Sequence, residues 1–194
     1  MRITDLLDKR SISLDAAPAD KKATLDMAVE LMAKSGKLMD VEQYRAQVYA
    51  REEESTTGIG EGIAIPHGKC DAVKTPGLAA MVIKNGVDYD SLDGEPVTLL
   101  FLIAAPNTKD NVHLDVLSKL SVMLMDENFT TSLRNAKSVE EFLQIIDAAD
   151  ESAKSIDDRL SDTGITTEEK KSFKLLAVTS CPTGIAHTLS LIHI

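Results

Sequence analysis

The sequence is poor in aromatic residues, in cysteine and in long apolar segments. Its 194 residues include no tryptophan, three tyrosines and four phenylalanines, although 43% are hydrophobic, so the expected core is mainly aliphatic. The two cysteines, Cys70 and Cys181, lack the paired spacing of metal ligands and do not suggest a disulfide framework. There is no signal peptide and no apolar run long enough to span a membrane, which predicts a soluble, cytoplasmic chain.

Positive charge is also scarce. The sequence has 21 lysines and arginines against 31 aspartates and glutamates, which gives a net charge of −10. Such a chain does not attract nucleic acid or an anionic membrane through a general field. The excess of negative charge suits docking to a carrier with a basic patch. The length leaves room for one well-packed domain followed by a tail.

Helical and extended patterns alternate along the chain. Helices are predicted at 20–35, from Asp40 to Arg51, and at 111–126, 129–135 and 138–147. The clearest strands are 78–84 and 97–105. The second of these is apolar on both faces, so we expect it in the middle of a sheet that is covered on each side. The interleaving predicts a three-layer α/β/α sandwich.

A glycine-rich segment from Ser55 to Lys69 contains one histidine, His67. The glycines at 58, 60 and 62 allow positive φ angles and a close approach of the backbone to a ligand or partner. Ile63 and Ile65 then form a short buried strand. Pro66 fixes its own φ and favours extended geometry before it, so we expect His67 to leave the strand in a defined direction, in a stiff loop.

Two common phosphate-binding loops are excluded by counting. A P-loop has four residues between its first glycine and the Gly-Lys-Ser/Thr, whereas five separate Gly62 from Gly68, and Cys70 follows Lys69. The dinucleotide fingerprint also fails, because Ile63 stands where its last glycine belongs. The spacing therefore leaves two interpretations of the histidine, either a residue that closes a tight turn or a reactive imidazole.

The segment resembles a known active-site signature. Thr57-Gly-Ile-Gly-Glu-Gly-Ile-Ala-Ile-Pro-His67-Gly is similar to that of the enzyme IIA domain of the fructose/mannitol class in the bacterial phosphotransferase system. Similarity extends to Arg51-Glu52, to Leu92-Asp-Gly-Glu-Pro-Val97 and to the helix opening at His113, over residues 1–148. The resemblance implies a mixed sheet. It also implies that His67 accepts a phosphoryl group from the carrier HPr and passes it to a IIB domain.

His113 is a second candidate site residue. It shares a helical face with Leu117, Leu120 and Leu124, near a helix N-terminus that Asp110 is expected to cap. The dipole and unpaired amides of that terminus favour an anion. By its position alone His113 could equally be a hydrogen-bonded core histidine. The resemblance implies that it is the second active-site histidine, donating to the phosphoryl oxygens.

Arg51 is the third candidate. It ends the predicted helix that begins at Asp40, where Asp40-Val-Glu-Gln43 has the form of a capping box. A solvated charge at a helix C-terminus would explain it equally well. The resemblance implies instead a contact to phosphate. The three glutamates at 52–54 are expected to form a solvated face, and no role is assigned to Glu61.

The composition changes after the predicted IIA-like domain. Residues 149–172 are rich in Asp, Glu, Ser, Lys and Thr and are predicted to form a flexible linker. A buried-type strand then leads from Phe173 into Ser180-Cys-Pro-Thr-Gly, which resembles the start of a fructose-class IIB domain, with Cys181 at the phosphoryl-acceptor position. Residues 173–194 are too short to bury their own apolar faces, so we expect a truncated remnant in which Cys181 is incompetent.

The leading hypothesis is a phosphocarrier in sugar uptake, with HPr, a IIB domain and a membrane IIC domain as partners. Those partners would hold it at the inner face of the membrane. No motif requires a metal or an organic cofactor. The alternative is a regulatory phosphoprotein like the nitrogen-related IIA proteins, and the third hypothesis is a non-catalytic α/β interaction module. The start of a IIB domain at Phe173 favours transport.

Overall fold

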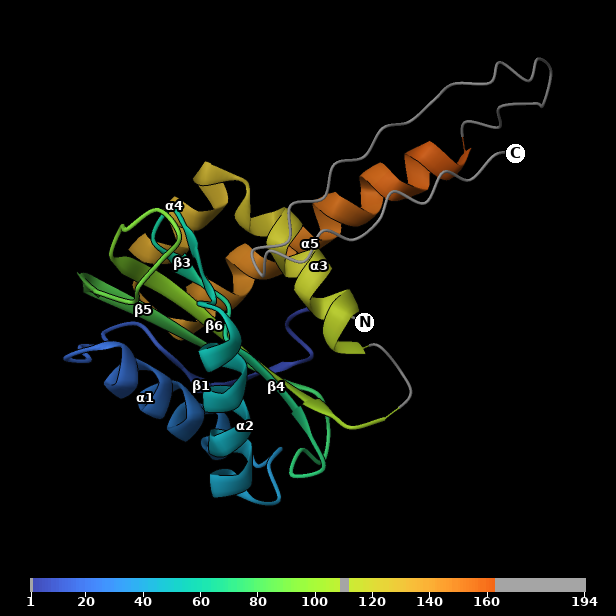
Figure 1. Ribbon diagram of the computed structural model, residues 1–194. Helices are drawn as coiled ribbons and strands as arrows, with labels where there is room; N and C mark the ends of the chain where they lie inside the picture. The colour runs from blue at the N-terminus through green and yellow to red at the C-terminus, as the bar shows by residue number, and fades with distance from the viewer. Residues whose placement is uncertain (1, 109–111, 163–194) are drawn as a thin grey trace, which may run out of the picture.

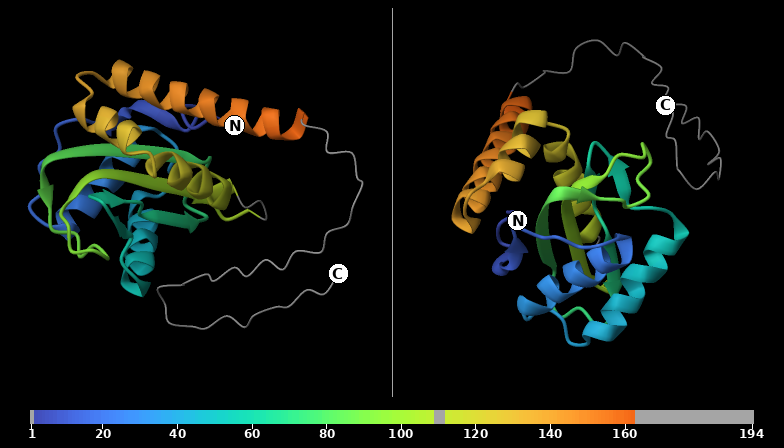
Figure 2. Two further views of the ribbon diagram at one scale, coloured as in Figure 1. Left: turned by 90° about the horizontal axis from the view of Figure 1, so that it is seen from above. Right: turned by 90° about the vertical axis from the view of Figure 1, so that its left-hand side faces the viewer.

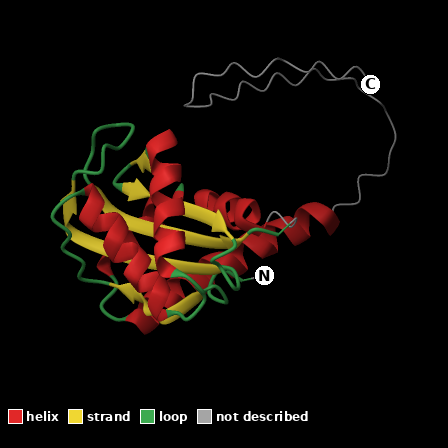
Figure 3. Ribbon diagram, turned by 60° about the horizontal axis from the view of Figure 1, so that its bottom comes forward, coloured by secondary structure: helices red, strands yellow, loops and turns green. Residues whose placement is uncertain are grey.

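The computed structural model describes residues 2–108 and 112–162, and it has a mixed β-sheet between two layers of helices (Figure 1). The strands are β1 (Leu7–Ser13), β2 (Gly58–Gly60), β3 (Ile63–Ala64), β4 (His67–Cys70), β5 (Gly77–Val87) and β6 (Val97–Pro106). The helices are α1 (Lys21–Lys34), α2 (Val41–Glu54), α3 (Val112–Leu124), α4 (Glu127–Asn135) and α5 (Val139–Asp162). Helices α1 and α2 cover one face, and α3, α4 and α5 cover the other (Figures 2 and 3). This confirms the predicted three-layer α/β/α sandwich.

Strand β6 is the centre of the sheet. The strand order is β1-β5-β6-β3-β2, and β4 also pairs with β6. Strand β5 runs antiparallel to β6, whereas β3 and β4 run parallel to it. The central position was predicted from the two apolar faces of this segment. Leu99, Phe101 and Ile103 pack under α3–α5, while Leu100 and Leu102 pack under α1 and α2.

An aspartate caps each of the first two helices, and the cap at Asp40 was predicted. The Asp20 carboxylate accepts a hydrogen bond from the Ala23 N–H at 2.8 Å, and Asp40 accepts one from the Gln43 N–H at 3.0 Å. Each bond satisfies an amide that has no partner inside its helix. The chain leaves α1 through Gly36, whose φ of 72° suits a glycine just beyond a helix end.

Three features differ from the sequence predictions. Strand β1 was not predicted, because charged residues at 8–10 interrupt its alternation; it is an edge strand with an irregular register against β5. His67 does not lie in a loop but is the first residue of strand β4. Pairing with β6 holds this short segment, which includes Gly68, in an extended conformation. The last helix was expected to end at residue 147, but α5 continues to Asp162 and extends past the sheet (Figure 2).

The helical residues 149–162 replace the first part of the expected linker. Residues 163–194, which include the rest of that linker and the IIB-like segment with Cys181, lie outside the described residues. Within residues 2–108 and 112–162, no helix is both long enough and apolar enough to cross a bilayer.

Gly68 lets α2 pack directly on β4. A Cβ atom at this position would lie 2.9 Å from Cε2 of Tyr44 and 3.2 Å from Cγ2 of Val48, both on α2. The Tyr44 hydroxyl, fully buried, donates to the carbonyl of Ile103 at 3.0 Å. Glycine is therefore required beside His67 because the helix lies so close, and the helix in turn carries Arg51.

We expect Gly68→Ala to destabilise the fold by about 1–3 kcal/mol, because the added methyl overpacks a full interface. The change should appear as a lower urea midpoint with an unaltered slope. Tyr44→Phe provides a comparison at the same contact, since it removes the buried hydrogen bond without adding volume. A Gly68→Ala protein with the wild-type midpoint would contradict the close packing of α2 on β4.

Candidate active site

The imidazole of His67 is held at both ring nitrogens. Its Nδ1 lies 3.1 Å from the carbonyl oxygen of Ile65, and its Nε2 lies 3.1 Å from Nε of Arg51. A carbonyl can only accept a hydrogen bond and a guanidinium can only donate one. The proton of the neutral ring is therefore on Nδ1, and Nε2 presents a lone pair. The half-buried ring is thus oriented, with its nucleophilic nitrogen directed at a cation.

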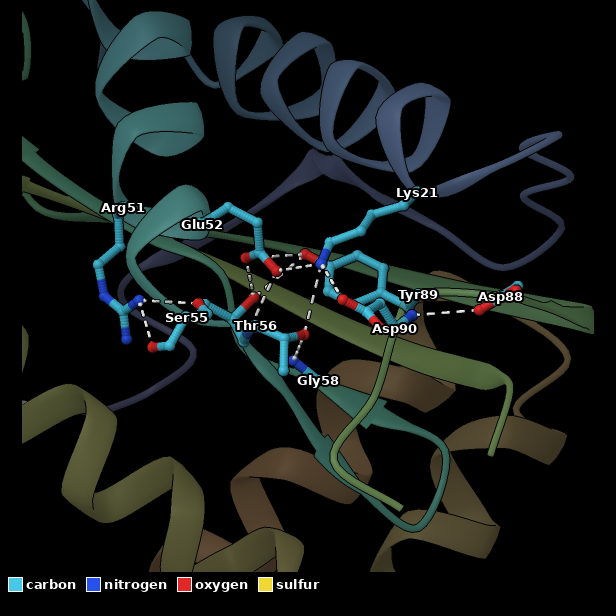
Figure 4. Close-up of polar contacts among 10 residues, drawn as sticks. Lys21, Arg51, Glu52, Ser55, Thr56, Gly58, Asp88, Tyr89 and Asp90 are labelled. Carbon is cyan, nitrogen blue, oxygen red and sulfur yellow. Dashed lines mark hydrogen bonds and ion pairs between the residues drawn. The ribbon is translucent and has the colours of Figure 1, made fainter. Parts of the chain in front are cut away.

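Arg51 is fixed at the C-terminal end of α2. Its Nη1 donates to the carbonyl oxygen of Ser55 at 3.1 Å and to the Ser55 hydroxyl at 3.2 Å (Figure 4). The guanidinium therefore contacts the chain just after the helix and the imidazole at once. The alternative interpretation, that Arg51 is a solvated charge at the end of a helix, does not fit, because its side chain is half-buried.

Glu52 contradicts the expectation of a solvated glutamate run. Its side chain is buried, whereas Glu53 and Glu54 are exposed as predicted. The carboxylate accepts hydrogen bonds from the N–H and the hydroxyl of Thr57. It also lies close to the Tyr89 hydroxyl and pairs with Lys21 of α1 (Figure 4). The sequence contains one indication that Glu52 differs from its neighbours, because Arg51-Glu52 is among the segments that resemble enzyme IIA domains.

The glycine hairpin before His67 is held by two residues that sequence reasoning did not assign. The φ angles of Gly60, Glu61 and Gly62 are 105°, 55° and 72°. A positive φ is uncommon for a residue other than glycine, such as Glu61. The Glu61 N–H donates to Asp93 at 2.7 Å, and the Glu61 carbonyl accepts from Arg134 at 2.7 Å. Backbone N–H bonds from residues 61 and 95 lower the pKa of the Asp93 carboxyl. The backbone of Glu61, rather than its carboxylate, makes these contacts.

Burial of Tyr89, with the Glu52 carboxylate beside it, raises the pKa of its hydroxyl well above the usual range. The hydroxyl therefore stays protonated and remains a hydrogen-bond donor at neutral pH. In residues 2–108 and 112–162 no group of three or more His, Cys, Asp or Glu side chains could hold a metal ion.

His113 is the second residue of α3, and its side chain lies outside the described part of the chain. The expected cap, Asp110, also lies outside it. The backbone places α3 soon after β6, whose Ile103 pairs with His67. The helix N-terminus thus follows the end of β6 at Pro106, three residues beyond the pairing of Ile103 with His67.

A comparison with protein families identifies the family of this chain. Residues 5–149 match the family described as "Phosphoenolpyruvate-dependent sugar phosphotransferase system, EIIA 2". The chain belongs to this family, whose members are phosphotransferases that relay phosphoryl groups through a histidine. This confirms the resemblance to enzyme IIA domains.

Similar proteins include fructose-specific phosphotransferase components and nitrogen regulatory proteins. The chain is 43% identical to the fructose-specific EIIABC component of Bacillus subtilis over 97% of its own length and 29% of that protein. It is 39% identical to the fructose-specific EIIA component of Haloferax volcanii over 66% of the chain and 82% of that protein. The crystal structure of nitrogen regulatory protein IIA-Ntr from Neisseria meningitidis, at 32% identity, covers 74% of this chain and 98% of its own with a TM-score of 0.69. The chain spans less than a third of the length of the EIIABC relatives that it matches.

The hydrogen bond from Arg51 should control the tautomer of His67. We expect Arg51→Met to raise the population of the Nε2–H form by a factor of about 2–10, which corresponds to the loss of about 0.5–1.5 kcal/mol for one hydrogen bond. Nitrogen-15 NMR of the imidazole at pH 8 measures the two forms. Arg45→Met is the matched control, because Arg45 lies on the same helix and pairs with Asp26 and Glu30 instead. Equal ring shifts in both variants and wild type would argue against the contact.

Proposed function

We propose that His67 is the phosphoryl-accepting residue of this IIA domain, with Nε2 as the acceptor atom. The observation that supports it best is the pair of opposed contacts on one ring, Ile65 at Nδ1 and Arg51 at Nε2. Together they select the tautomer in which Nε2 is nucleophilic. Positioning and charge stabilisation are what phosphoryl transfer mainly requires of a protein.

The proposed reaction has two displacements at phosphorus. The Nε2 lone pair of His67 forms a nitrogen–phosphorus bond while the bond to the donor, phospho-HPr, breaks and its electron pair stays on the donor. A cysteine thiolate of a IIB domain then attacks, and Nε2 regains its lone pair. Because Nδ1–H bonds a carbonyl, the ring tolerates the positive charge of the phosphorylated state. The guanidinium of Arg51 lies where it can neutralise phosphoryl oxygens.

His113 is proposed as a second donor to those oxygens. Its place in the first turn of α3 supports this role, because backbone amides and the helix dipole favour an anion there. The proposal assigns binding of the transferring group to His113 and nucleophilic attack to His67.

We further propose that the acceptor system is a sugar uptake system of the fructose type. Two relatives that match 97% and 87% of the chain are named as fructose-specific EIIABC components, which supports IIB and membrane IIC domains as partners. Those partners would bring the domain to the inner face of the membrane. Cys181 would belong to the IIB-like segment, and its competence in this chain stays a prediction.

A regulatory role is the second candidate function, and the similarity to nitrogen regulatory IIA-Ntr favours it. In that case the phosphorylated and unphosphorylated forms of His67 would bind a partner differently. Transfer from the phosphorylated chain to a fructose-class IIB domain separates the two, because a purely regulatory protein would retain its phosphate.

Incubation with phosphoenolpyruvate, enzyme I and HPr should add one acid-labile phosphate at His67. Mass spectrometry under mildly alkaline conditions locates it. We expect His67→Ala to abolish the label, because no other described group presents the same arginine-held lone pair. His187→Ala, in the C-terminal tail, is the control and should label normally. Label retained by His67→Ala would overturn the assignment.

His113→Ala should slow phosphoryl transfer by about 10²–10³-fold, the usual cost of removing one donor to a developing charge. The fold should be preserved, which circular dichroism and thermal unfolding can check. Rapid-quench measurement of transfer from phospho-HPr gives the rate. A wild-type rate in a folded variant would return His113 to a structural role.

A further inference from the structure

The Glu52 carboxylate is a buried charge with four donor groups around it. The residue is only 8% exposed, in a helix that otherwise presents glutamates to solvent at this end. One oxygen accepts from the Thr57 N–H at 3.0 Å and pairs with Nζ of Lys21 at 2.9 Å. The other accepts from the Thr57 hydroxyl and lies 3.4 Å from the Tyr89 hydroxyl. A buried carboxylate is tolerated only with this kind of compensation.

The hydrogen bonds of Glu52 lead directly to the two ring contacts of His67. Thr57, which Glu52 holds through both its N–H and its hydroxyl, accepts the Ile65 N–H on its carbonyl at 3.0 Å. The Ile65 carbonyl in turn lies 3.1 Å from Nδ1 of His67. Nε2 of the same ring takes the hydrogen bond of Arg51, the residue before Glu52. The contacts therefore form a closed circuit that begins and ends on the last turn of α2.

Lys21 and Tyr89 brace this circuit from other elements. Lys21 lies at the start of α1, with its ammonium 5.0 Å from the centre of the Tyr89 ring, a cation–π distance (Figure 4). The Tyr89 hydroxyl, 3.1 Å from that of Thr57, comes from the segment after β5. Helix α1, helix α2 and the chain after β5 thus converge on one carboxylate, although none of these contacts touches the imidazole.

We propose that Glu52 is a positioning residue for phosphoryl transfer, which sets the distance and angle between the Arg51 guanidinium and the His67 ring. The proposal rests on the proposed role of His67. Arg51 contacts Nε2 of His67 directly. Glu52 is linked to Nδ1 of the same ring through Thr57 and Ile65. A shift of the end of α2 relative to Thr57 would therefore change both contacts of the imidazole. Fixed geometry of this kind matters because a misplacement of about 1 Å can cost about 10²-fold in rate.

The test compares three variants of the full chain. Glu52→Met has a similar length but no acceptor, and we expect it to lower the rate of transfer at saturating phospho-HPr by about 10²-fold with little change in KM. Glu52→Gln should keep most of the rate, because its oxygen can serve the Thr57 N–H and Lys21 while the hydroxyls rotate to accept from its amide. Glu53→Met, the same substitution at the exposed neighbour, should behave as wild type.

Nitrogen-15 NMR of His67 in the unphosphorylated protein supplies a readout that a loss of stability alone would not move. Glu52→Met should raise the Nε2–H tautomer population in folded protein, and Glu52→Gln should not. Should Glu52→Met fail to fold, Thr57→Val is the second variant, because it removes the hydroxyl bonds with little change of shape. We expect it to lower the transfer rate and to raise the Nε2–H tautomer population in the same way.

A folded Glu52→Met or Thr57→Val protein with the wild-type rate and ring shifts would overturn the positioning role and leave the proposed function intact. A wild-type chain that takes no phosphate from phospho-HPr would overturn the proposed function instead. In that event the ring shifts still report whether Glu52 orients the imidazole. Equal losses in Glu52→Met and Glu53→Met would also contradict the proposal, because they would trace the effect to surface charge.

Discussion

The double-sided pairing of β6 is the constraint on which the rest of this structure depends. This strand bonds β5 on one side and β3 and β4 on the other, and its side chains fill both cores. Its parallel pairing with β4 aligns His67 with Ile103 and turns a short glycine-containing segment into a strand. The same pairing lets Tyr44 of α2 reach the Ile103 carbonyl over Gly68. The sheet thereby places the helix that carries Arg51 beside the imidazole.

The proposed active site is distinguished by the restraint of its side chains rather than by an unusual residue. A histidine has two equivalent-looking nitrogens, and here a carbonyl and a guanidinium distinguish them. Each of those groups is itself held, Ile65 through Thr57 and Arg51 through Ser55. If the site acts as proposed, dipoles and charges fixed in this way would need no rearrangement during phosphoryl transfer. One continuous set of hydrogen bonds therefore fixes the tautomer of the proposed nucleophile and places a cation beside it.

Sequence reasoning worked where the signal is local. The cap at Asp40 and the two-faced apolar strand β6 depend on neighbouring residues or on burial pattern, and the structure has both of them. Glu52 was expected in solvent because it stands in a run of three glutamates, but it is buried. Its ion pair with Lys21 could not be predicted, because the two residues are far apart in the sequence. The edge strand β1 was missed because its charges hide the alternation.

The sequence by itself determined the family, the layered α/β fold and the histidine at the centre of the site, because a long glycine–isoleucine–proline motif and apolar periodicity are written in consecutive residues. Only the tertiary structure decided which nitrogen of His67 carries the lone pair, that Arg51 faces it, and that Glu52 is buried against Thr57 and Lys21. Those features depend on the contacts of Arg51 with His67 and of Lys21 with Glu52, which join different elements and are set by the packing of α2 on the sheet and on α1.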